Sequence, residues 1–317
     1  RCSDCGSLFI DRATLATIDA GKSTRIYDET YWADELHSAR ERADGVSLVR
    51  AGEAILYARR PVKRLLDVGT GPGYLLDGLA RHFPEHVDMF YGVELFPPEA
   101  HSRHPNYVVG DVGALKLRFD AGVCIDVVEH LTPQMLRNVA RGLAGISEPG
   151  SLWLFNTGMP EFVIEQDPGY LDPLRRGHIV SYGLRGAAHV FEPFGFRVSA
   201  IPGKSYAWFA EFRPRESPAF HERVYRPLPE NRKLLEESGL LFQAAFESAR
   251  ASLYMQAASD QADAAARADA NGCAGSPAPM DLWDEYQRVL HSRSWKLTRP
   301  LRAVVRWART LKRPQRV

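Results

Sequence analysis

Apolar and polar positions follow two regular patterns through the middle of the chain. Short apolar runs, typical of buried strands, are separated by segments in which apolar residues recur at helical spacing. The runs predict strands over residues 64–68, 89–95, 107–109, 121–128 and 151–156. Strands that alternate with helices form a parallel sheet connected by crossover helices. The pattern therefore predicts an α/β domain with a mainly parallel sheet and helices on both faces.

The segments between these strands predict helices over residues 46–58, 73–82 and 133–146. Thr132 suits the N-cap of the last of these, and Pro133 suits its first helical position. Residues 159–180 are rich in proline, glycine and charge, and predict a loop or lid. A further helix is expected over residues 184–194, followed by a β-hairpin over residues 196–201 and 208–213. The hairpin would complete a seven-stranded sheet.

The two ends of the chain differ from its middle in composition and in the pattern of apolar residues. The first 45 residues are polar and predict irregular structure. After a proline-marked boundary, residues 230–270 are rich in alanine and predict a helical extension with a one-sided apolar stripe at Phe242, Phe246, Ala249 and Leu253. The predicted organisation begins with an N-terminal segment (1–45) and an α/β domain (46–213). A helical extension (214–270), a flexible linker (271–279) and a short helix with a basic tail (280–317) follow.

Composition and charge exclude several classes of protein. With 45% hydrophobic and 25% charged residues, the 317-residue chain has enough apolar material for a core, which excludes wholesale disorder, collagen and coiled-coil fibre. The net charge of +1 conceals an uneven distribution: residues 293–317 carry nine basic and no acidic residues, which leaves residues 1–292 with a net charge of −8. An acidic body repels phosphates, so we expect no nucleic-acid partner.

The sequence shows neither a signal peptide nor a long apolar run of membrane-spanning length. Its four cysteines are too few and too scattered for a disulfide scaffold. We therefore expect a cytoplasmic location.

The strongest chemical signal lies where the first predicted strand ends. Asp67 is followed by Gly69, Gly71 and Gly73 in the segment LDVGTGPG. Glycines permit positive φ angles and let a ligand approach the backbone closely. A dinucleotide site would show G-x-G-x-x-G and would hold a pyrophosphate there, but the carboxylate of Asp67 would repel that group. The segment thus argues against a nicotinamide-dependent oxidoreductase and favours a ligand with an amino or sulfonium group.

The pattern Asp67-x-Gly69-x-Gly71-x-Gly73 resembles motif I of the class I S-adenosylmethionine-dependent methyltransferases, and further acids follow in the family's order. The resemblance implies a Rossmann-like methyltransferase fold over about residues 46–213 and S-adenosylmethionine as the methyl donor. In this family the acid at the position of Glu94 binds the ribose hydroxyls, and the acid at the position of Asp111 contacts the adenine amine. The donor-binding residues implied are Asp67, Gly69, Thr70, Gly71, Gly73, Glu94, Asp111, Val112 and Asp126.

The segment Asp126-Val127-Val128-Glu129-His130 resembles the D-V-x-E-H segment of ubiquinone-type O-methyltransferases and many sugar methyltransferases. Methyl transfer mainly requires alignment of donor and acceptor, but an oxygen acceptor also needs a base, for which histidine is suited. His130 and His178 are the candidate bases, with Glu129 beside them. Alternatively, each histidine has a purely structural role, or Glu129 and His130 form part of a divalent-metal site that lacks further ligands.

Two features of the N-terminal segment allow more than one interpretation. Tyr27, Tyr31 and Trp32 are expected either to form a lid over the donor or to pack as an aromatic cluster. Cys2 and Cys5 form C-x2-C-G, half of a zinc knuckle, whereas structural zinc takes four ligands. The sequence therefore predicts no complete zinc site, and zinc is expected only if upstream ligands exist.

The basic tail has a helical pattern of its own. Leu301, Val304, Ala308 and other apolar residues lie on one predicted face, and arginines lie on the opposite face. This pattern is typical of an interfacial membrane binder, although it also suits an acidic partner or the acidic body of this chain. The segment SWKLTRPL resembles the tails of bacterial glycosyltransferases and methyltransferases of surface-polysaccharide clusters.

Together these resemblances imply methyl transfer to a sugar or glycan, nucleotide-linked or lipid-linked, in bacterial surface polysaccharide biosynthesis. The tail would attach the enzyme to the inner face of the plasma membrane or to glycan-assembly proteins. Two alternatives remain open. One is a small-molecule or quinone-type O-methyltransferase, and the other is an inactive scaffold that keeps the fold and recruits partners.

Overall fold

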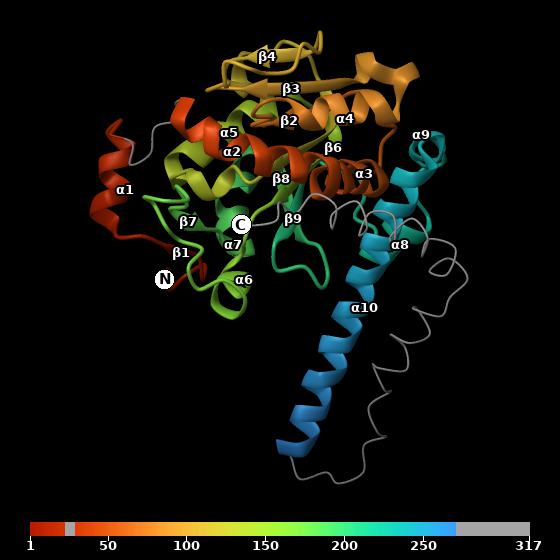
Figure 1. Ribbon diagram of the computed structural model, residues 1–317. Coiled ribbons are helices and arrows are strands. Elements are labelled where there is room, and N and C mark those ends of the chain that lie inside the picture. Colours follow the sequence, from red (N-terminus) through yellow and green to blue (C-terminus); the bar gives the residue numbers. More distant parts are fainter. Residues whose placement is uncertain (23–28, 271–317) are drawn as a thin grey trace, which may run out of the picture. The chain divides into compact units, whose positions relative to one another are not determined.

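A computed structural model describes residues 1–22 and 29–270 (Figure 1). The chain divides into a compact unit of residues 1–254 and a second unit that begins at Met255. Of the second unit, the structure describes residues 255–270, which belong to the last helix. The predicted linker, short helix and basic tail lie outside the described residues. No helix within the described ranges is long and apolar enough to cross a membrane.

A seven-stranded sheet forms the centre of the first unit, in the spatial order β4-β3-β2-β5-β6-β9-β8. Its strands are β2 (Leu65–Val68), β3 (Phe90–Glu94), β4 (Tyr107–Val109), β5 (Phe119–Ile125), β6 (Ser147–Asn156), β8 (Phe196–Ala200) and β9 (Ala207–Phe212). The first five in the spatial order are parallel, and β9 is antiparallel to both β6 and β8. The prediction of a Rossmann-like, mainly parallel seven-stranded sheet closed by a hairpin is therefore confirmed.

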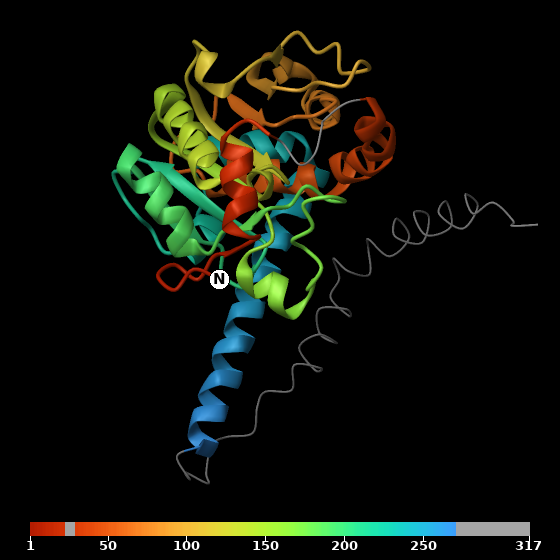
Figure 2. The same ribbon diagram turned by 90° about the vertical axis from the view of Figure 1, so that its left-hand side faces the viewer.

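Helices cover both faces of the sheet (Figures 1 and 2). One face packs against α3 (Leu48–Tyr57), α4 (Tyr74–His82), α9 (Pro229–Glu237) and the first part of α10 (Gly239–Ala270), and the other against α5 (Pro133–Ile146) and α7 (Leu184–Phe191). The neighbours Leu65 and Leu66 contribute to opposite core clusters, because side chains alternate along a strand. All four residues of β2 are buried, as expected for a central parallel strand.

The helices begin close to their predicted positions. The side chain of Thr132 caps α5 by accepting from the backbone N–H of Met135 at 3.2 Å. The predicted apolar stripe of Phe242, Phe246, Ala249 and Leu253 packs against the core, which confirms it. The long helix expected over residues 230–270 is divided at Ser238 into α9 and α10. Short 3-10 helices complete the structure at Pro84–Met89 (η2), Val112–Ala114 (η3), Val128–His130 (η4) and Glu192–Phe194 (η5).

The N-terminal segment is more regular than its sequence predicts. It contains β1 (Leu8–Phe9), α1 (Arg12–Asp19), α2 (Glu29–Arg42) and a π-helical turn, η1 (Ala43–Ser47). The expectation of irregular structure here is therefore wrong. Helix α2 is mostly polar, so its sequence lacks the apolar stripe from which helices are predicted. Helix α1 is stabilised by Asp11, which accepts from the backbone N–H of Thr14, and by Ile18, which is buried against the domain.

Two further segments differ from the sequence prediction. The predicted loop over residues 159–180 contains α6 (Pro160–Glu165) and leads into β7 (Val180–Ser181), which pairs with β1. Strand β5 ends at Ile125 instead of continuing to residue 128. The cause is Asp126, whose φ of 54° interrupts the strand and turns the chain into η4. Strand β7 depends on pairing with a distant segment and the end of β5 depends on local backbone geometry, and the apolar pattern records neither.

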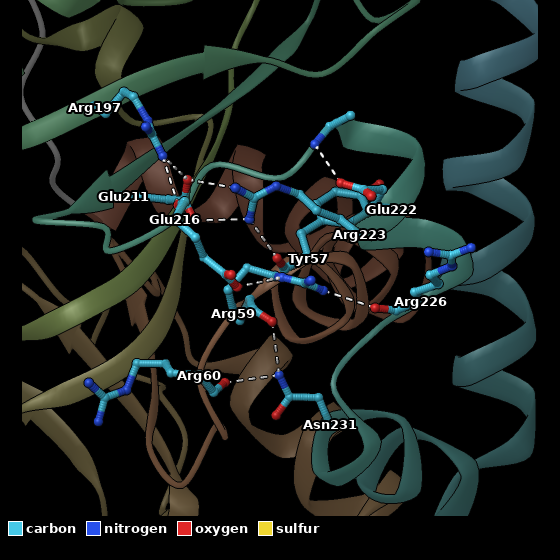
Figure 3. Close-up of polar contacts among 12 residues, drawn as sticks. Tyr57, Arg59, Arg60, Arg197, Glu211, Glu216, Glu222, Arg223, Arg226 and Asn231 are labelled. Atoms are coloured by element: carbon cyan, nitrogen blue, oxygen red, sulfur yellow. Dashed lines mark hydrogen bonds and ion pairs between the residues drawn. The ribbon is translucent and has the colours of Figure 1, made fainter.

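Buried polar contacts join α8 (Phe220–Tyr225) to the sheet (Figure 3). Arg223 and Glu211 are each 1% exposed, so their charges are removed from water. The Arg223 guanidinium donates to both Glu211 carboxylate oxygens, at 2.9 and 2.7 Å, and to the carbonyl oxygen of Tyr57 at 2.9 Å. Close by, Arg59 donates to the carbonyl oxygen of Arg226 at 2.9 Å. Residues after 213 are thereby joined to the same compact unit as the sheet.

We expect Arg223→Met to lower the free energy of unfolding by about 3 kcal/mol, because it leaves the Glu211 carboxylate buried without its main cation. The double variant Arg223→Met/Glu211→Gln should lose much less, since it removes both charges. Urea unfolding followed by circular dichroism measures both effects. A single variant as stable as the wild type would show that the pair is not important for stability.

Candidate active site

A cavity of about 530 Å³ lies at the carboxyl ends of the parallel strands. Val68, Glu94 and Asp126, at or just after the ends of β2, β3 and β5, line one side. Ile18 of α1 and Ile179 also line it. A second hollow of about 110 Å³ shares Asp126 with the cavity and is lined by the glycine loop after β2. In open α/β sheets, ligands bind at this edge.

The glycine loop is fixed in a conformation that a side chain would not tolerate. Gly69, Gly71 and Gly73 have φ angles of 72°, 55° and 78°. A Cβ atom on Gly69 would lie 2.5 Å from the Val127 side chain. The backbone N–H of Gly71 donates to Glu94 Oε2 at 2.8 Å. The predicted motif therefore forms a cradle that brings backbone to the surface of both hollows.

Asp67 and Thr70 line the smaller hollow. Asp67 is 4% exposed, and this burial raises the pKa of its carboxyl to about 7. Among the described residues, no lysine, arginine or histidine forms an ion pair with Asp67. A buried carboxylate of this kind is stabilised by a cationic ligand. The cradle and its acid thus fit the methionine end of S-adenosylmethionine.

Glu94, the last residue of β3, and Asp111, which follows β4, line the larger cavity, where the donor's ribose and adenine are expected. Glu94 also fixes the turn that follows it, because Oε1 accepts from the backbone N–H of Phe96 at 2.9 Å. Each carboxylate oxygen has a further lone pair that a ribose hydroxyl could use. Asp111 caps η3 by accepting from the backbone N–H of Gly113 at 2.7 Å, and it lines the cavity together with Val112.

Two of the three predicted lid aromatics border both hollows. Tyr31 and Trp32 stack edge to face, with ring centroids 4.9 Å apart. Trp32 donates from Nε1 to the carbonyl oxygen of Phe96 at 3.2 Å, and its ring lies over Gly71. Tyr27 lies outside the described residues. Trp32 therefore lies against the glycine loop, and the role of this aromatic pair as a lid over the donor stays a prediction.

Asp126 lines both hollows and is held by two neighbours. Asn156 Nδ2 donates to Asp126 Oδ1 at 3.1 Å, and Arg42 Nε lies 3.4 Å from Oδ2. Burial raises the pKa of the Asp126 carboxyl, whereas the charge of Arg42 opposes that shift. Neither Asn156 nor Arg42 was singled out from the sequence, because an isolated polar residue in a strand or helix carries no pattern.

The structure brings the three candidate catalytic residues together. One ligand atom each from Glu129, His130 and His178 lie within 4.8 Å of one another. His130 Nδ1 bonds to the carbonyl oxygen of Gly177 and His178 Nδ1 to that of Tyr170, each at 3.0 Å. Because a carbonyl oxygen only accepts, each Nδ1 carries a proton and the lone pair of the neutral ring is on Nε2. Of the three residues, His130 lines the larger cavity.

Burial shifts the protonation of this cluster. It raises the pKa of Glu129 to about 8 and lowers that of His178 to about 3, with the neighbouring His130 adding to the second shift. At neutral pH the cluster therefore contains a mostly protonated carboxyl and a neutral imidazole. The lowered pKa makes His178 a weaker proton acceptor than an imidazole in water.

Tyr170 is a residue of this site that the sequence analysis missed. Its hydroxyl donates to Glu129 Oε1 at 2.9 Å and accepts from the backbone N–H of Gly158 at 2.8 Å. Glu129 Oε2 has no hydrogen-bond partner among the described residues. Tyr170 lies in the predicted lid, but a single tyrosine in an irregular segment carries no signal of its own.

The same cluster could hold a divalent cation. Histidines that ligate metals usually donate their other ring N–H to a carbonyl or carboxylate, as both histidines do here. The structure thus adds His178 to the Glu129–His130 pair that was incomplete from the sequence. Cys2 and Cys5 lie in the turn before β1 and line neither of the two hollows.

A family model described as a methyltransferase domain matches residues 29–201, more than half of the chain. The chain belongs to this methyltransferase family. It is an S-adenosylmethionine-dependent methyltransferase, as its motifs predicted. A comparison with curated proteins gives no match.

Several solved methyltransferase structures are similar to this methyltransferase. DesVI from Streptomyces venezuelae is 17% identical, with 58% of this chain and 98% of that chain covered and a TM-score of 0.42. The sugar N-methyltransferase KedS8 from Streptoalloteichus is 16% identical, with 57% of this chain and 92% of that chain covered and a TM-score of 0.45. The amino pentose methyltransferase CalS10 from Micromonospora echinaspora, solved with bound S-adenosylmethionine, is 21% identical, with 64% and 98% covered and a TM-score of 0.39.

The raised pKa of Asp67 predicts a pH-dependent donor site. Protonation of Asp67 below about pH 7 removes the charge that pairs with the ligand's ammonium group, so affinity for S-adenosylhomocysteine should rise about tenfold from pH 6 to pH 8. Titration calorimetry measures this change and the proton released on binding. Asp67→Asn should bind more weakly with little pH dependence. A flat wild-type profile would contradict the assignment of Asp67.

Proposed function

We propose that this enzyme methylates a hydroxyl group of a sugar or glycan, carried on a nucleotide or a lipid, in bacterial surface polysaccharide biosynthesis. The observation that carries the proposal is the cluster of Glu129, His130 and His178, which supplies a base to the cavity beside the donor site. The D-V-x-E-H segment and the SWKLTRPL tail support the sugar acceptor through their sequence resemblance.

When bound, S-adenosylmethionine supplies a methyl group on a positively charged sulfur, from which the methyl passes to the acceptor oxygen. Asp67 and the glycine loop hold the cationic end of that molecule. His130 faces the cavity, so it orients the acceptor hydroxyl and takes its proton on Nε2. His178 packs edge-on against His130, with ring centroids 4.9 Å apart, and keeps the ring in place. Trp32 covers the glycine loop and limits the access of water.

The apolar part of the cavity favours a second candidate, a small-molecule or quinone-type O-methyltransferase. Ile18, Leu131, Met135 and Ile179 line the cavity near the polar groups. A phenol or quinol would pack its ring on this surface and present its hydroxyl to the same histidine. The apolar surface also suits the lipid part of a lipid-linked glycan.

A transfer assay with labelled S-adenosylmethionine distinguishes these acceptors. Nucleotide-sugars and lipid-linked glycans should accept the methyl group, whereas phenols and quinols should not. Labelling of a phenol but of no sugar would favour the second candidate and overturn the first.

Two variants in the same assay test the base. His130→Ala should lower kcat about 100-fold or more, and His178→Ala should also lower it, because proton removal from the hydroxyl is lost or misaligned. Both should bind S-adenosylhomocysteine as the wild type does. Full turnover by both variants would exclude a catalytic role for either histidine.

We also propose that residues 293–317 attach the enzyme to an anionic membrane surface. Each basic residue near such a surface contributes about 1 kcal/mol, which makes the nine basic residues a strong attachment. Deleting residues 292–317 should abolish sedimentation with phosphatidylglycerol vesicles, and neutral vesicles should bind neither protein. Replacing Arg302, Arg306, Arg309 and Arg313 by glutamine keeps the apolar face and should weaken binding. Undiminished sedimentation after the deletion would overturn this proposal.

A further inference from the structure

A series of polar contacts begins at the half-buried Asp126 and leads away from the cavity into the core. Asn156 Nδ2 donates to Asp126 Oδ1 at 3.1 Å, and Asn156 Oδ1 accepts from Arg50 Nε at 2.9 Å. Arg50 is on α3 and donates from Nη1 to Glu53 Oε2, one turn further along the same helix. The amide of Asn156 thus connects a carboxylate in the cavity to a guanidinium in the core.

The series of polar contacts continues from Glu53 to helix α10. Lys204 belongs to the turn that connects β8 and β9, and its Nζ donates to Glu53 Oε1. The same ammonium group donates to Ser248 Oγ at 3.2 Å. Nearby, Ser252 Oγ donates to the carbonyl oxygen of Pro202, in the turn that carries Lys204. Helix α10 therefore anchors the end of this series of polar contacts that lies farthest from Asp126.

The buried charged residues of this series include one more cation than carboxylate. Arg50, Glu53 and Lys204 are 4%, 0% and 7% exposed, so two cations and one carboxylate are buried together. Asp126, which also pairs with Arg42 at 3.4 Å, is connected to this group through the Asn156 amide. Buried ion pairs contribute little net stability, because desolvation offsets their attraction, and apolar residues could fill the same space at lower cost. The arrangement therefore favours a functional role.

Asp126 needs such support. Its φ of 54° is a left-handed conformation that costs a residue other than glycine about 1–3 kcal/mol and persists only when neighbouring contacts maintain it. Its side chain borders both hollows of the active site. On the core side, the Asn156 amide determines how this carboxylate points.

We propose that Asn156, Arg50, Glu53 and Lys204 are positioning residues that hold Asp126 toward the methyl donor, with Ser248 of α10 completing this relay. The proposal rests on the placement of Asp126 in the donor site. The helical extension is then part of the donor-binding machinery.

The test compares two buried ion pairs in the full-length protein. Glu53→Gln/Lys204→Met removes one positive and one negative charge together, which keeps the net charge of the group unchanged, and it also takes the carboxylate partner away from Arg50. It should raise the Kd for S-adenosylhomocysteine, measured by titration calorimetry, about fivefold to tenfold, corresponding to about 1–1.4 kcal/mol. The matched control is Arg223→Met/Glu211→Gln, which removes a similarly buried pair (Figure 3) that shares no residue with the relay. It should leave the Kd unchanged.

A double-mutant cycle with Asp126→Asn separates positioning from general destabilisation. If the relay acts through Asp126, adding Glu53→Gln/Lys204→Met to Asp126→Asn should cause little further loss of affinity. Additive losses would overturn the proposal, since they would show that the relay acts elsewhere. Asn156→Ala interrupts the relay at its other end and serves in the same cycle if the first variant does not fold.

The outcomes distinguish the relay from the donor site itself. If Asp126→Asn weakens binding of S-adenosylhomocysteine and neither relay variant does, the relay proposal is wrong, and the assignment of Asp126 to the donor site is retained. If Asp126→Asn binds as tightly as the wild type, Asp126 is not a donor residue and the relay proposal falls with it. Failure of the wild type to bind S-adenosylhomocysteine would instead contradict the donor assignment.

Discussion

The structure depends on carboxylates that are buried or half-buried at the carboxyl ends of its central strands. Asp67 at the end of β2 and Asp126 and Glu129 after β5 all have raised pKa values, because burial disfavours their charged forms. A fold selected for stability alone would not place acids there. A ligand with a positive charge removes this penalty, and in the proposed function the charged end of S-adenosylmethionine does so at the glycine loop. The unfavourable burial in the ligand-free protein is therefore a source of binding energy and selectivity.

The far side of the cavity is made by parts of the chain that are distant in sequence. Helix α1 contributes Ile18, and it is held in place by a hydrogen bond from Thr132 to Asp19. The segment before β7 contributes Gly177 and Ile179, and the ring of His178 between them is oriented by the carbonyl oxygen of Tyr170. Strand β1 pairs with β7 and connects these two parts. In the proposed function, the sheet presents the donor-binding edge, while the N-terminal segment and the segment before β7 shape the acceptor side.

The helices after the sheet are integrated with the domain through buried charge. Arg223 and Glu211 join α8 to β9, and Lys204 with Ser248 joins the last hairpin to α10. Apolar packing from Phe242 and Ala249 accompanies these contacts. The predicted boundary after residue 213 therefore marks a change in secondary structure within a compact unit that continues to residue 254.

The sequence by itself determined the sheet, most helix positions, the glycine loop with Asp67 and the family. Those features depend on local periodicity, capping and turn chemistry, which neighbouring residues encode. It placed Glu129 beside His130 but did not show that His178 joins them. Only the tertiary structure decided that cluster, the role of Tyr170, the helix α2 and the buried contacts from Asp126 to Ser248. These depend on polar partners tens of residues apart, and neither an apolar pattern nor a short motif records which buried polar group meets which.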